Sequence, residues 1–561
     1  MFRIDRLTAA LALASALAFG QGQNAPLIDV LAQELARNFQ SLKEKGDPPP
    51  YFMAYTAVET QTDVVSASLG ALIRSNRARE RYFDCSVRVG SREFDNYHLV
   101  DGDRARFARA IVLPIEDSAD PVRRLVWKET DRVYQAAVQR LIRIKTRTQM
   151  KTEKAETSDD FSTESPVVAS EKVPAYQFPR DVWEKRLRKL SAAINEYPGI
   201  LTSHVSVSSQ RDTKILVNTE GTKIQHGWVM SRVTLSVRGK APDGQDLTLF
   251  DSFEAADPAR LPSDEVLMAA MSRLAEEFTK LQRAPEADPY VGPAILSGRA
   301  AAVFFHEIFG HRIEGHRQKD ETEGQTFAKR VGTKILPDFL SVVFDATASK
   351  QNGTDLMGTY RYDDEGVRAR RVTLVDKGVL KEFLMSRTPI PGFPKSNGHG
   401  RKEIGQEIVS RQSNLFVDAS VHVSDADLRK KLITEVQKQN KPYGLYFDQV
   451  TGGFTTTGRR GLQAFTVIPL VVYRVYPDGR PDELVRGVDI VGTPLTSFEK
   501  IMAAGTRSDV FNGYCGAESG NVPVSAVSPA LLISEIETQR KANPGDRPPF
   551  LPRPPETGGD Y

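Results

Sequence analysis

Cysteine is scarce in this chain, because its 561 residues include only Cys85 and Cys515. Two cysteines are too few for a disulfide scaffold, and without CxxC spacing they do not form a zinc ribbon. A charge excess is also missing, since 75 Lys and Arg face 72 Asp and Glu, which gives a formal net charge of +3. This balance provides no bulk attraction to nucleic acid or to anionic membranes, and no nucleic-acid-binding motif occurs. We therefore predict no nucleic-acid partner.

Hydrophobic runs long enough to span a membrane are missing as well. Beyond the N-terminus no stretch approaches the ~18 uninterrupted apolar residues of a membrane-spanning helix, so we predict no integral membrane span in the mature chain. The N-terminus itself is typical of an export signal: Arg3 and Arg6 precede an apolar run over 7–19, which ends in Ala18-Phe19-Gly20. We expect cleavage near Gly20 and an exported protein, either periplasmic or secreted. The alternative is a membrane-tethered or buried N-terminal helix.

The composition that is present, 40% hydrophobic and 26% charged, is typical of a globular chain. Apolar residues recur at helical spacing over 27–42, 122–148 and 264–281, which predicts three amphipathic helices. Short β-rich pieces occur between 51 and 113 and again between 204 and 237. The polar stretch 151–170 predicts a solvent-exposed segment with no chemistry.

The best interdomain boundary is the Pro-containing run over 283–289. Beyond it strand patterns dominate, with a hairpin over 371–385 and a long apolar run over 462–475. We predict an α+β protein of two domains. The predicted parts are a signal peptide (1–20), an N-terminal α/β domain with long helices (21–284), a β-rich C-terminal domain (285–540) and a Pro/Gly-rich tail (541–561).

The sharpest local signal is HEIFGH at 306–311, with another histidine at 316. A five-residue step on an ideal helix is a turn of ~140°, which would point His306 and His311 apart. Gly310 favours a π-bulge or local unwinding that would bring both imidazoles onto one metal ion. We predict His306 and His311 as zinc ligands, with Glu307 as the general base that accepts a proton from the attacking water.

A catalytic zinc normally has three protein ligands and one open position, so a third ligand is needed. Glu314 and His316 are nearby candidates; Glu314 could instead hydrogen-bond to a histidine, and His316 could be solvated. Cys515 is the remote candidate, and glycines on both sides predict that it lies in an exposed, turn-rich loop. From the residues alone, two alternatives to metal ligation stay open, a cysteine kept for packing and a disulfide with Cys85, and together they weigh about as much as ligation.

HEIFGHRIEGH at 306–316, together with YDDEGV at 362–367, the hairpin to Leu384 and CGAESGNVPVSAVSPALLI from Cys515, resembles the TldD/PmbA metallopeptidase family. The resemblance covers roughly 284–535. It implies that 285–540 is a zinc-peptidase domain with one zinc ion per chain. It further implies His306, His311 and Cys515 as the zinc ligands, with Glu307 as base.

The resemblance also implies partners and substrates. Family members act as paired subunits that enclose a cavity for unfolded peptides, so we expect a homodimer or a heterodimer with a family homologue, acting on unfolded or flexible peptides. The segment 451–458 resembles a family segment near the cleft, which makes Gly453, Phe454 and Thr455 candidates for binding a peptide by β-augmentation; an ordinary surface hairpin is the alternative. The predicted function is an exported zinc metallopeptidase. The alternative function is a non-catalytic peptide-binding subunit of a TldD/PmbA-type complex.

Overall fold

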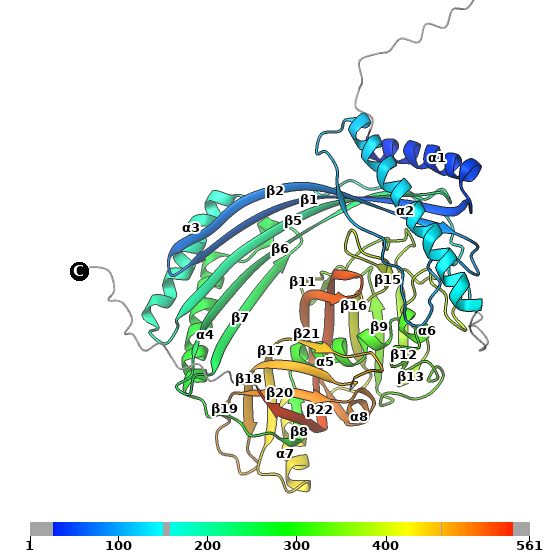
Figure 1. The fold of residues 1–561 in the computed structure, drawn as a ribbon. Helices are drawn as coiled ribbons and strands as arrows, with labels where there is room; N and C mark the ends of the chain where they lie inside the picture. The colour runs from blue at the N-terminus through cyan, green and yellow to red at the C-terminus, as the bar shows by residue number, and fades with distance from the viewer. Residues whose placement is uncertain (1–25, 150–157, 462, 542–561) are drawn as a thin grey trace, which may run out of the picture.

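The computed structural model describes residues 26–149, 158–461 and 463–541. The predicted signal peptide and nearly all of the predicted tail lie outside these residues. Within them the chain forms two domains, each with its own β-sheet and flanking helices (Figure 1), which confirms the α+β class. None of the helices in this described part has the length and apolar character needed to cross a bilayer.

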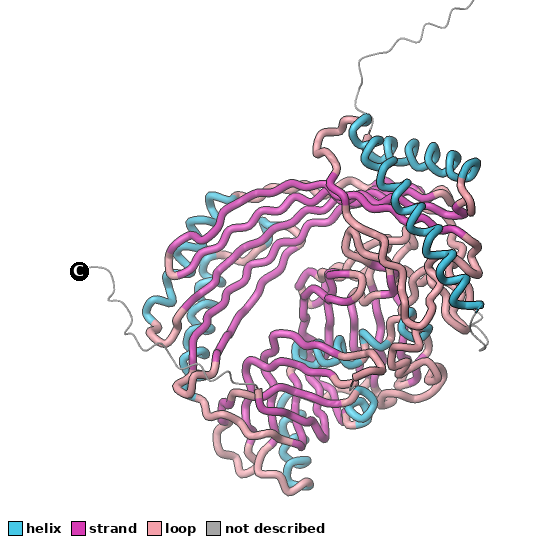
Figure 2. Tube along the Cα trace, in the orientation of Figure 1, coloured by secondary structure: helices cyan, strands magenta, loops and turns pink. Residues whose placement is uncertain are grey.

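The N-terminal domain is built on a long, curved sheet that arches over the second domain (Figures 1 and 2). Its order is β3-β2-β1-β5-β6-β4, with β7 also paired to β6. The strands are β1 (Pro50–Ser68), β2 (Ala71–Val89), β3 (Ile111–Val112), β4 (Val168–Ser170), β5 (Thr202–Asn218), β6 (Lys223–Lys240) and β7 (Asp246–Ala255). The helices that pack on this sheet are α1 (Leu27–Lys45), α2 (Ala119–Gln149), α3 (Arg180–Ala192) and α4 (Asp264–Arg283). The short 3₁₀ turns η1 (Ala193–Glu196) and η2 (Pro258–Arg260) belong to the same domain.

The strands of this sheet are longer than the sequence pattern predicts. The predicted pieces at 204–208 and 215–217 belong to one continuous strand, β5, and β1 and β2 pair along nearly their whole lengths. Polar residues in mid-strand conceal this continuity in the sequence. Asp63, for example, is fully buried in β1 because Arg77 of the neighbouring strand donates a hydrogen bond to it at 2.8 Å.

The stretch 151–170 is not simply solvent-exposed, as the sequence pattern predicts. Phe161 is 2% exposed and Asp160 is 3% exposed. The guanidinium groups of Arg88 and Arg387 lie 3.8 and 3.9 Å from the Phe161 ring centroid, one from each domain. Cation–π contacts with both domains bury this part of the segment, so the prediction was wrong for residues 160–162.

The C-terminal domain has an eleven-stranded sheet in the order β13-β12-β9-β16-β22-β20-β18-β17-β8, with β19 on β18 and β21 on β22. Because β8 also pairs with β22, the pairings β22-β20-β18-β17-β8 form a closed circuit. The sheet consists of β8 (Val291–Leu296), β9 (Leu340–Asp345), β12 (Arg371–Asp376), β13 (Val379–Leu380), β16 (Asn414–Ala419), β17 (Gly444–Thr455), β18 (Phe465–Val475), β19 (Glu483–Val485), β20 (Val488–Gly492), β21 (Ile501–Ala517) and β22 (Gly520–Arg540). Two small ribbons are β10 (Lys350–Gln351) with β11 (Thr354–Asp355) and β14 (Gly400–Arg401) with β15 (Val409–Ser410).

Helix α5 (Gly298–Ile308) lies at the centre of this domain and packs against β22, β17 and β21. Its residues 300–308 are all buried, and most of them are apolar, as expected of a helix at the centre of a domain. Ser297 caps its N-terminus, because its hydroxyl accepts a hydrogen bond from the Ala300 amide. The remaining helices are η3 (Gly310–Arg312), α6 (His316–Lys319), α7 (Asp425–Lys438) and α8 (Pro494–Glu499).

Candidate metal centre

The end of helix α5 determines where the two motif histidines lie. His306 and Glu307 are in its last turn, the helix ends at Ile308, and the chain continues as the 3₁₀ turn η3, which contains His311. The helix therefore unwinds before His311, as the five-residue spacing requires. Gly310 makes this possible, because a Cβ at that position would lie 1.9 Å from the Gln412 amide oxygen.

Cys515 comes from the other end of the domain. It lies in β21 opposite Val522 of β22 and is 3% exposed, so the prediction of an exposed loop was wrong. The glycines on both sides of Cys515 belong to the regular hairpin of β21 and β22 and do not interrupt its pairing. Cys85 is likewise buried in β2, and both thiols are free, which excludes the disulfide.

The fold brings His306, His311 and Cys515 together. One ligand atom from each lies within 4.8 Å of the other two, and the Cys515 Sγ is 3.3 Å from the His311 Nε2. Zn–N bonds of ~2.0–2.1 Å and Zn–S bonds of ~2.3 Å place ligand atoms about 3.3–3.6 Å apart in a tetrahedral site. The distance between Cys515 and His311 matches this separation, and two imidazoles and a thiol are the nitrogen and sulfur donors that zinc prefers.

The thiol and the imidazoles of the cluster shift each other's pKa. Burial alone would raise the pKa of Cys515, but His311 and His306 outweigh it and lower this pKa well below its usual value. Burial would lower the pKa of His311, but the Cys515 sulfur and Glu314 raise it. The shift of Cys515 favours the thiolate, which is the species that binds a metal, whereas His311 must give up its proton when a metal binds.

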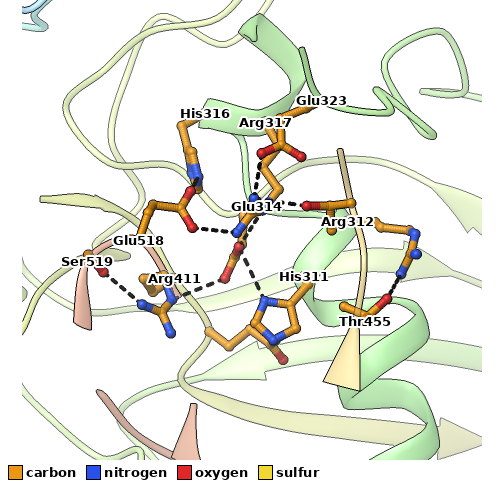
Figure 3. Close-up of polar contacts among 12 residues, drawn as sticks. His311, Arg312, Glu314, His316, Arg317, Glu323, Arg411, Thr455, Glu518 and Ser519 are labelled. Atoms are coloured by element: carbon orange, nitrogen blue, oxygen red, sulfur yellow. Dashed lines mark hydrogen bonds and ion pairs between the residues drawn. The ribbon is translucent and has the colours of Figure 1, made fainter. Parts of the chain in front are cut away.

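Glu314 faces the imidazole of His311 (Figure 3). It lies at the Nδ1 of that ring, whereas the Cys515 sulfur lies at the Nε2. Its Oε2 is 3.6 Å from the His311 Nδ1 and accepts a hydrogen bond of 2.8 Å from the Arg317 Nε. Burial would raise the pKa of Glu314, but Arg317, His311 and Arg411 together lower it to about 2. A permanently ionised carboxylate that faces the outer nitrogen of a ligand imidazole orients that ring toward the metal.

His316 does not join the cluster. It is 7% exposed, and its Nε2 lies 2.5 Å from Glu518, which also accepts a hydrogen bond from Arg317. Figure 3 shows Glu518 between His316 and Arg317. Neither the predicted direct ligation nor the predicted solvated position describes His316 in this arrangement, because it is buried in a charge network outside the cluster.

Two residues of this network were not indicated by the sequence pattern. Arg411 is fully buried, donates a hydrogen bond to the backbone oxygen of Cys515 and lies 3.4 Å from Glu314. Nothing in its local sequence distinguishes it. Glu518 is only three residues after Cys515, so its closeness to this candidate ligand in the sequence could have indicated that it lies near the site.

Glu307 lies at the edge of the cluster, and its side chain is tightly packed. It is 6% exposed, and burial raises the pKa of its carboxyl group. Gly453 of β17 passes directly against it: a Cβ on Gly453 would lie 2.7 Å from the Glu307 Cγ. A raised pKa and a fixed position next to three metal-ligand candidates suit a group that exchanges protons near neutral pH.

The cluster opens into a cavity of about 320 Å³. Its walls include the three ligand candidates, Glu307, the β17 residues 453–455 and the segment 514–518, which is the end of β21 and the first residue after it. Phe454 is 59% exposed, while the Thr455 hydroxyl accepts a hydrogen bond from Arg312. The structure thus places the predicted substrate-binding residues beside the cluster; their role in binding stays a prediction.

Residues 290–540 match the model of the PmbA/TldA metallopeptidase C-terminal domain. The chain is 25% identical over 338 residues to a metalloprotease of Methanothermobacter thermautotrophicus, which is 60% of this chain and 69% of the relative. It is 27% identical over 239 residues to a metalloprotease of Archaeoglobus fulgidus (42% and 51%) and 26% identical over 255 residues to a zinc metalloprotease TldD homologue of Saccharolobus solfataricus (45% and 52%). The chain thus spans only about half the length of the last two relatives.

Solved structures share the overall fold. A Thermotoga maritima protein described as a modulator of a DNA gyrase superposes with a TM-score of 0.60 at 16% identity, covering 91% of this chain and all of that one. TldE from Thermococcus kodakarensis superposes with a TM-score of 0.57 at 13% identity, over 89% and 99% of the two chains. The C-terminal domain is therefore similar to the metallopeptidase domains of the TldD/PmbA family, on the evidence of the family model and the named relatives. The solved structures add the likeness of the fold.

Proposed function

We propose that this protein is a zinc-dependent metallopeptidase that hydrolyses peptide bonds in flexible or unfolded peptides. One observation carries the proposal: His306, His311 and Cys515 place three ligand atoms within 4.8 Å of one another, at the wall of a cavity that Glu307 also lines. The name of the Saccharolobus relative, a zinc metalloprotease, supports zinc as the metal.

The residues of the cleft have separate tasks in this proposal. Zinc, when bound, supplies a Lewis acid that polarises the scissile carbonyl and makes water more acidic. Glu307 takes the proton of the attacking water and passes it to the departing amine, so no covalent intermediate is needed. Glu314 and Arg411 hold His311 and the Cys515 strand in place and do not touch the substrate.

An extended peptide fits the wall formed by β17. This strand pairs with β18 as far as Thr455, whereas its pairing with β8 is limited to Leu445–Phe447. Residues 453–455, beyond that second pairing, line the cavity. A substrate strand bound there by backbone hydrogen bonds would be selected for its lack of structure and not for its sequence, as in β-augmentation.

Location and assembly are further parts of the proposal. The export signal leads us to place the mature N-terminus at or near Gln21, outside the cytoplasm. The likeness to a structure named TldE supports pairing with a second family member, and a homodimer is the other arrangement. N-terminal sequencing of the native protein and its mass in solution, alone and with a co-purified partner, test these points. Unprocessed Met1 in a cytoplasmic fraction would contradict the export proposal.

Metal analysis combined with a digest tests the activity itself. The purified mature protein should contain one zinc ion per chain and should degrade an unstructured protein such as casein, and a chelator should abolish the degradation until zinc is restored. Glu307→Gln is the matched control, because it should retain the zinc without the activity. Stoichiometric zinc and tight peptide binding with no turnover in the unsubstituted protein would favour the alternative of a non-catalytic peptide-binding subunit.

A further inference from the structure

A second cavity of about 290 Å³ adjoins the metal centre on the side of the N-terminal domain. His306, Glu307, Gly453 and Tyr514 line both this cavity and the first one, so the two are parts of one cleft. Whatever peptide lies across Glu307 in the proposed function must also extend toward this second space.

The second cavity is built by both domains. Strands β6 and β7 of the arching sheet contribute Arg232, Thr234, Phe250 and Ser252, and α5 of the C-terminal domain contributes Arg299. In Figure 1 β7 is the strand of the curved sheet that runs along the side of the C-terminal domain. The N-terminal sheet therefore supplies one wall of the cleft beside the metal centre.

Arg299 is the unusual residue of this cavity. Its guanidinium lies between the rings of Phe250 and Phe511, 5.8 and 5.6 Å from their centroids. Its Nε is buried and lacks a hydrogen-bond partner among the described residues, and the side chain forms no ion pair there. The Arg299 side chain as a whole is half-buried, and the carboxylates of Glu254, Asp251 and Asp509 act on its charge without forming an ion pair with it. Its guanidinium is therefore free to pair with a ligand carboxylate in the cavity.

The other arginine of the cavity already has its carboxylate. Arg232 donates hydrogen bonds to Glu254 at 2.8 Å and to the backbone oxygen of Asn512 at 2.9 Å. Arg232 thus has an ion-pair partner, whereas Arg299 has none among the described residues. The hydroxyls of Thr234 and Ser252 line the same space and add neutral donors.

We infer that Arg299 binds a carboxylate of the peptide substrate, so that the enzyme favours peptides that carry an acidic group at one fixed distance from the cleaved bond. Arginine and carboxylate form paired, charge-assisted hydrogen bonds, which are strong in a site with few water molecules. The carboxylate comes either from an aspartate or glutamate side chain or from the C-terminus of the peptide. This inference rests on the proposed peptidase function and deepens it, because it names a substrate class.

A matched set of quenched fluorescent peptides tests the inference. One neutral sequence is made with a single glutamate at each successive position, with glutamine at the same position, and with either a free or an amidated C-terminus. For the unsubstituted enzyme we expect glutamate at one position, or the free C-terminus, to raise kcat/KM by at least ~10-fold over its neutral counterpart, since a site built to pair a polar group rejects analogues without it. Faster cleavage of a glutamate peptide identifies a side chain as the source of the carboxylate, and faster cleavage of the peptide with a free C-terminus identifies the C-terminus.

Arg299→Gln should bring that ratio close to one while cleavage of the fully neutral peptide persists. Arg299→Lys should keep part of the preference, because it keeps the charge but loses the planar pair of donors. Arg273→Gln, which removes an exposed arginine on α4, is the matched control and should leave the ratio unchanged. An acidic preference that survives Arg299→Gln would overturn the inference.

Binding separates this inference from the proposed function. The same peptides are titrated against Glu307→Gln and against Glu307→Gln with Arg299→Gln, by fluorescence anisotropy. Tighter binding of the acidic peptide that disappears only in the double variant supports the carboxylate site even where no peptide is cleaved. Equal binding and equal cleavage of acidic and neutral peptides by the unsubstituted protein would overturn the inference while leaving the peptidase function intact, and this arm does not depend on the folding of any Arg299 variant.

Discussion

Gly453 and Glu307 are in direct contact across the cleft, and the absence of a side chain at Gly453 sets the position of the glutamate. A Cβ on Gly453 would lie 2.7 Å from the Glu307 Cγ and 3.2 Å from its Cδ. It would also meet the backbone oxygen of Thr466 at 2.6 Å, so the strand cannot simply move away. A residue chosen from the sequence as a substrate-binding candidate thus also controls the predicted catalytic base.

Gly453→Ala should therefore reduce peptidase turnover by about 10²-fold or more, because a displacement of about 1 Å in a reacting group can cost that much. Gly452→Ala is the matched control in the same strand: a Cβ there meets nothing within 4 Å. The steady-state rates of the two variants on an unstructured substrate, with zinc content measured in parallel, check this prediction. Equal rates would show that Glu307 is not held by this contact.

Glu307→Gln should retain zinc and lose at least ~10²-fold in turnover, the low end of general acid–base contributions. The amide has nearly the size of the carboxylate but cannot take a proton from water. Zinc analysis and kcat measured on one preparation separate loss of the base from loss of the metal. Near-normal turnover in this variant would remove Glu307 from the mechanism.

Cys515→Ser should lower zinc occupancy, because a hydroxyl is a poor replacement for a thiolate ligand. Cys85 is the matched control, since it is also a buried free cysteine in a strand. Cys85→Ser should leave zinc occupancy unchanged. Alkylation gives a second measurement: Cys515 should resist thiol reagents in the zinc-loaded protein and react after chelation. Full occupancy in Cys515→Ser would show that another residue completes the site.

Glu314→Gln should weaken zinc affinity by about 10- to 100-fold, as loss of a carboxylate behind a ligand histidine commonly does. Glu323→Gln is its control, since Glu323 also accepts a hydrogen bond from Arg317, at 2.8 Å, but no contact joins it to His311. Competition with a chromogenic chelator measures both affinities. Equal affinities would mean that Arg317, and not the carboxylate of Glu314, is what His311 requires.

The sequence predicts those residues of the site that lie close to one another in the chain. His306, Glu307 and His311 lie within six residues, and their spacing together with Gly310 predicts the unwound turn that the structure contains. Cys515 became the favoured third ligand only through the family resemblance, because nothing local distinguishes a ligand cysteine from a buried one. Arg411 reaches the cleft through the folding of a distant segment, so no local pattern could indicate it. Arg299 lies two turns before His306 on the same helix, so its position was a usable signal that the sequence analysis did not take up.

In the fold, too, features set by local sequence are predicted and features set by distant partners are not. Helices are well predicted by their apolar periodicity, and α4 begins at the residue after Ser263, as predicted. The long strands of the first sheet are broken into short pieces in the sequence pattern, because residues such as Asp63 and Arg77 interrupt the apolar alternation. These charges are accommodated only by partners on neighbouring strands, and that pairing is a property of the sheet and not of either segment alone.

The contact between the two domains includes a buried ion pair whose loss should destabilise the protein. The Lys402 Nζ lies 2.6 Å from each carboxylate oxygen of Asp84 in β2, and the two side chains are 4% and 1% exposed. Asp84→Ala leaves a buried ammonium group without a counter-charge, so it should lower the free energy of unfolding by ~3–5 kcal/mol. Asp478→Ala breaks an exposed pair with Arg480 and should leave the free energy of unfolding nearly unchanged. Denaturant titration measures the free energy of unfolding of both variants. The double variant Asp84→Leu with Lys402→Met tests the cause. It should recover much of the lost free energy of unfolding, because it removes both charges. A double variant as unstable as Asp84→Ala would assign the effect to packing at Asp84 and not to the uncompensated charge.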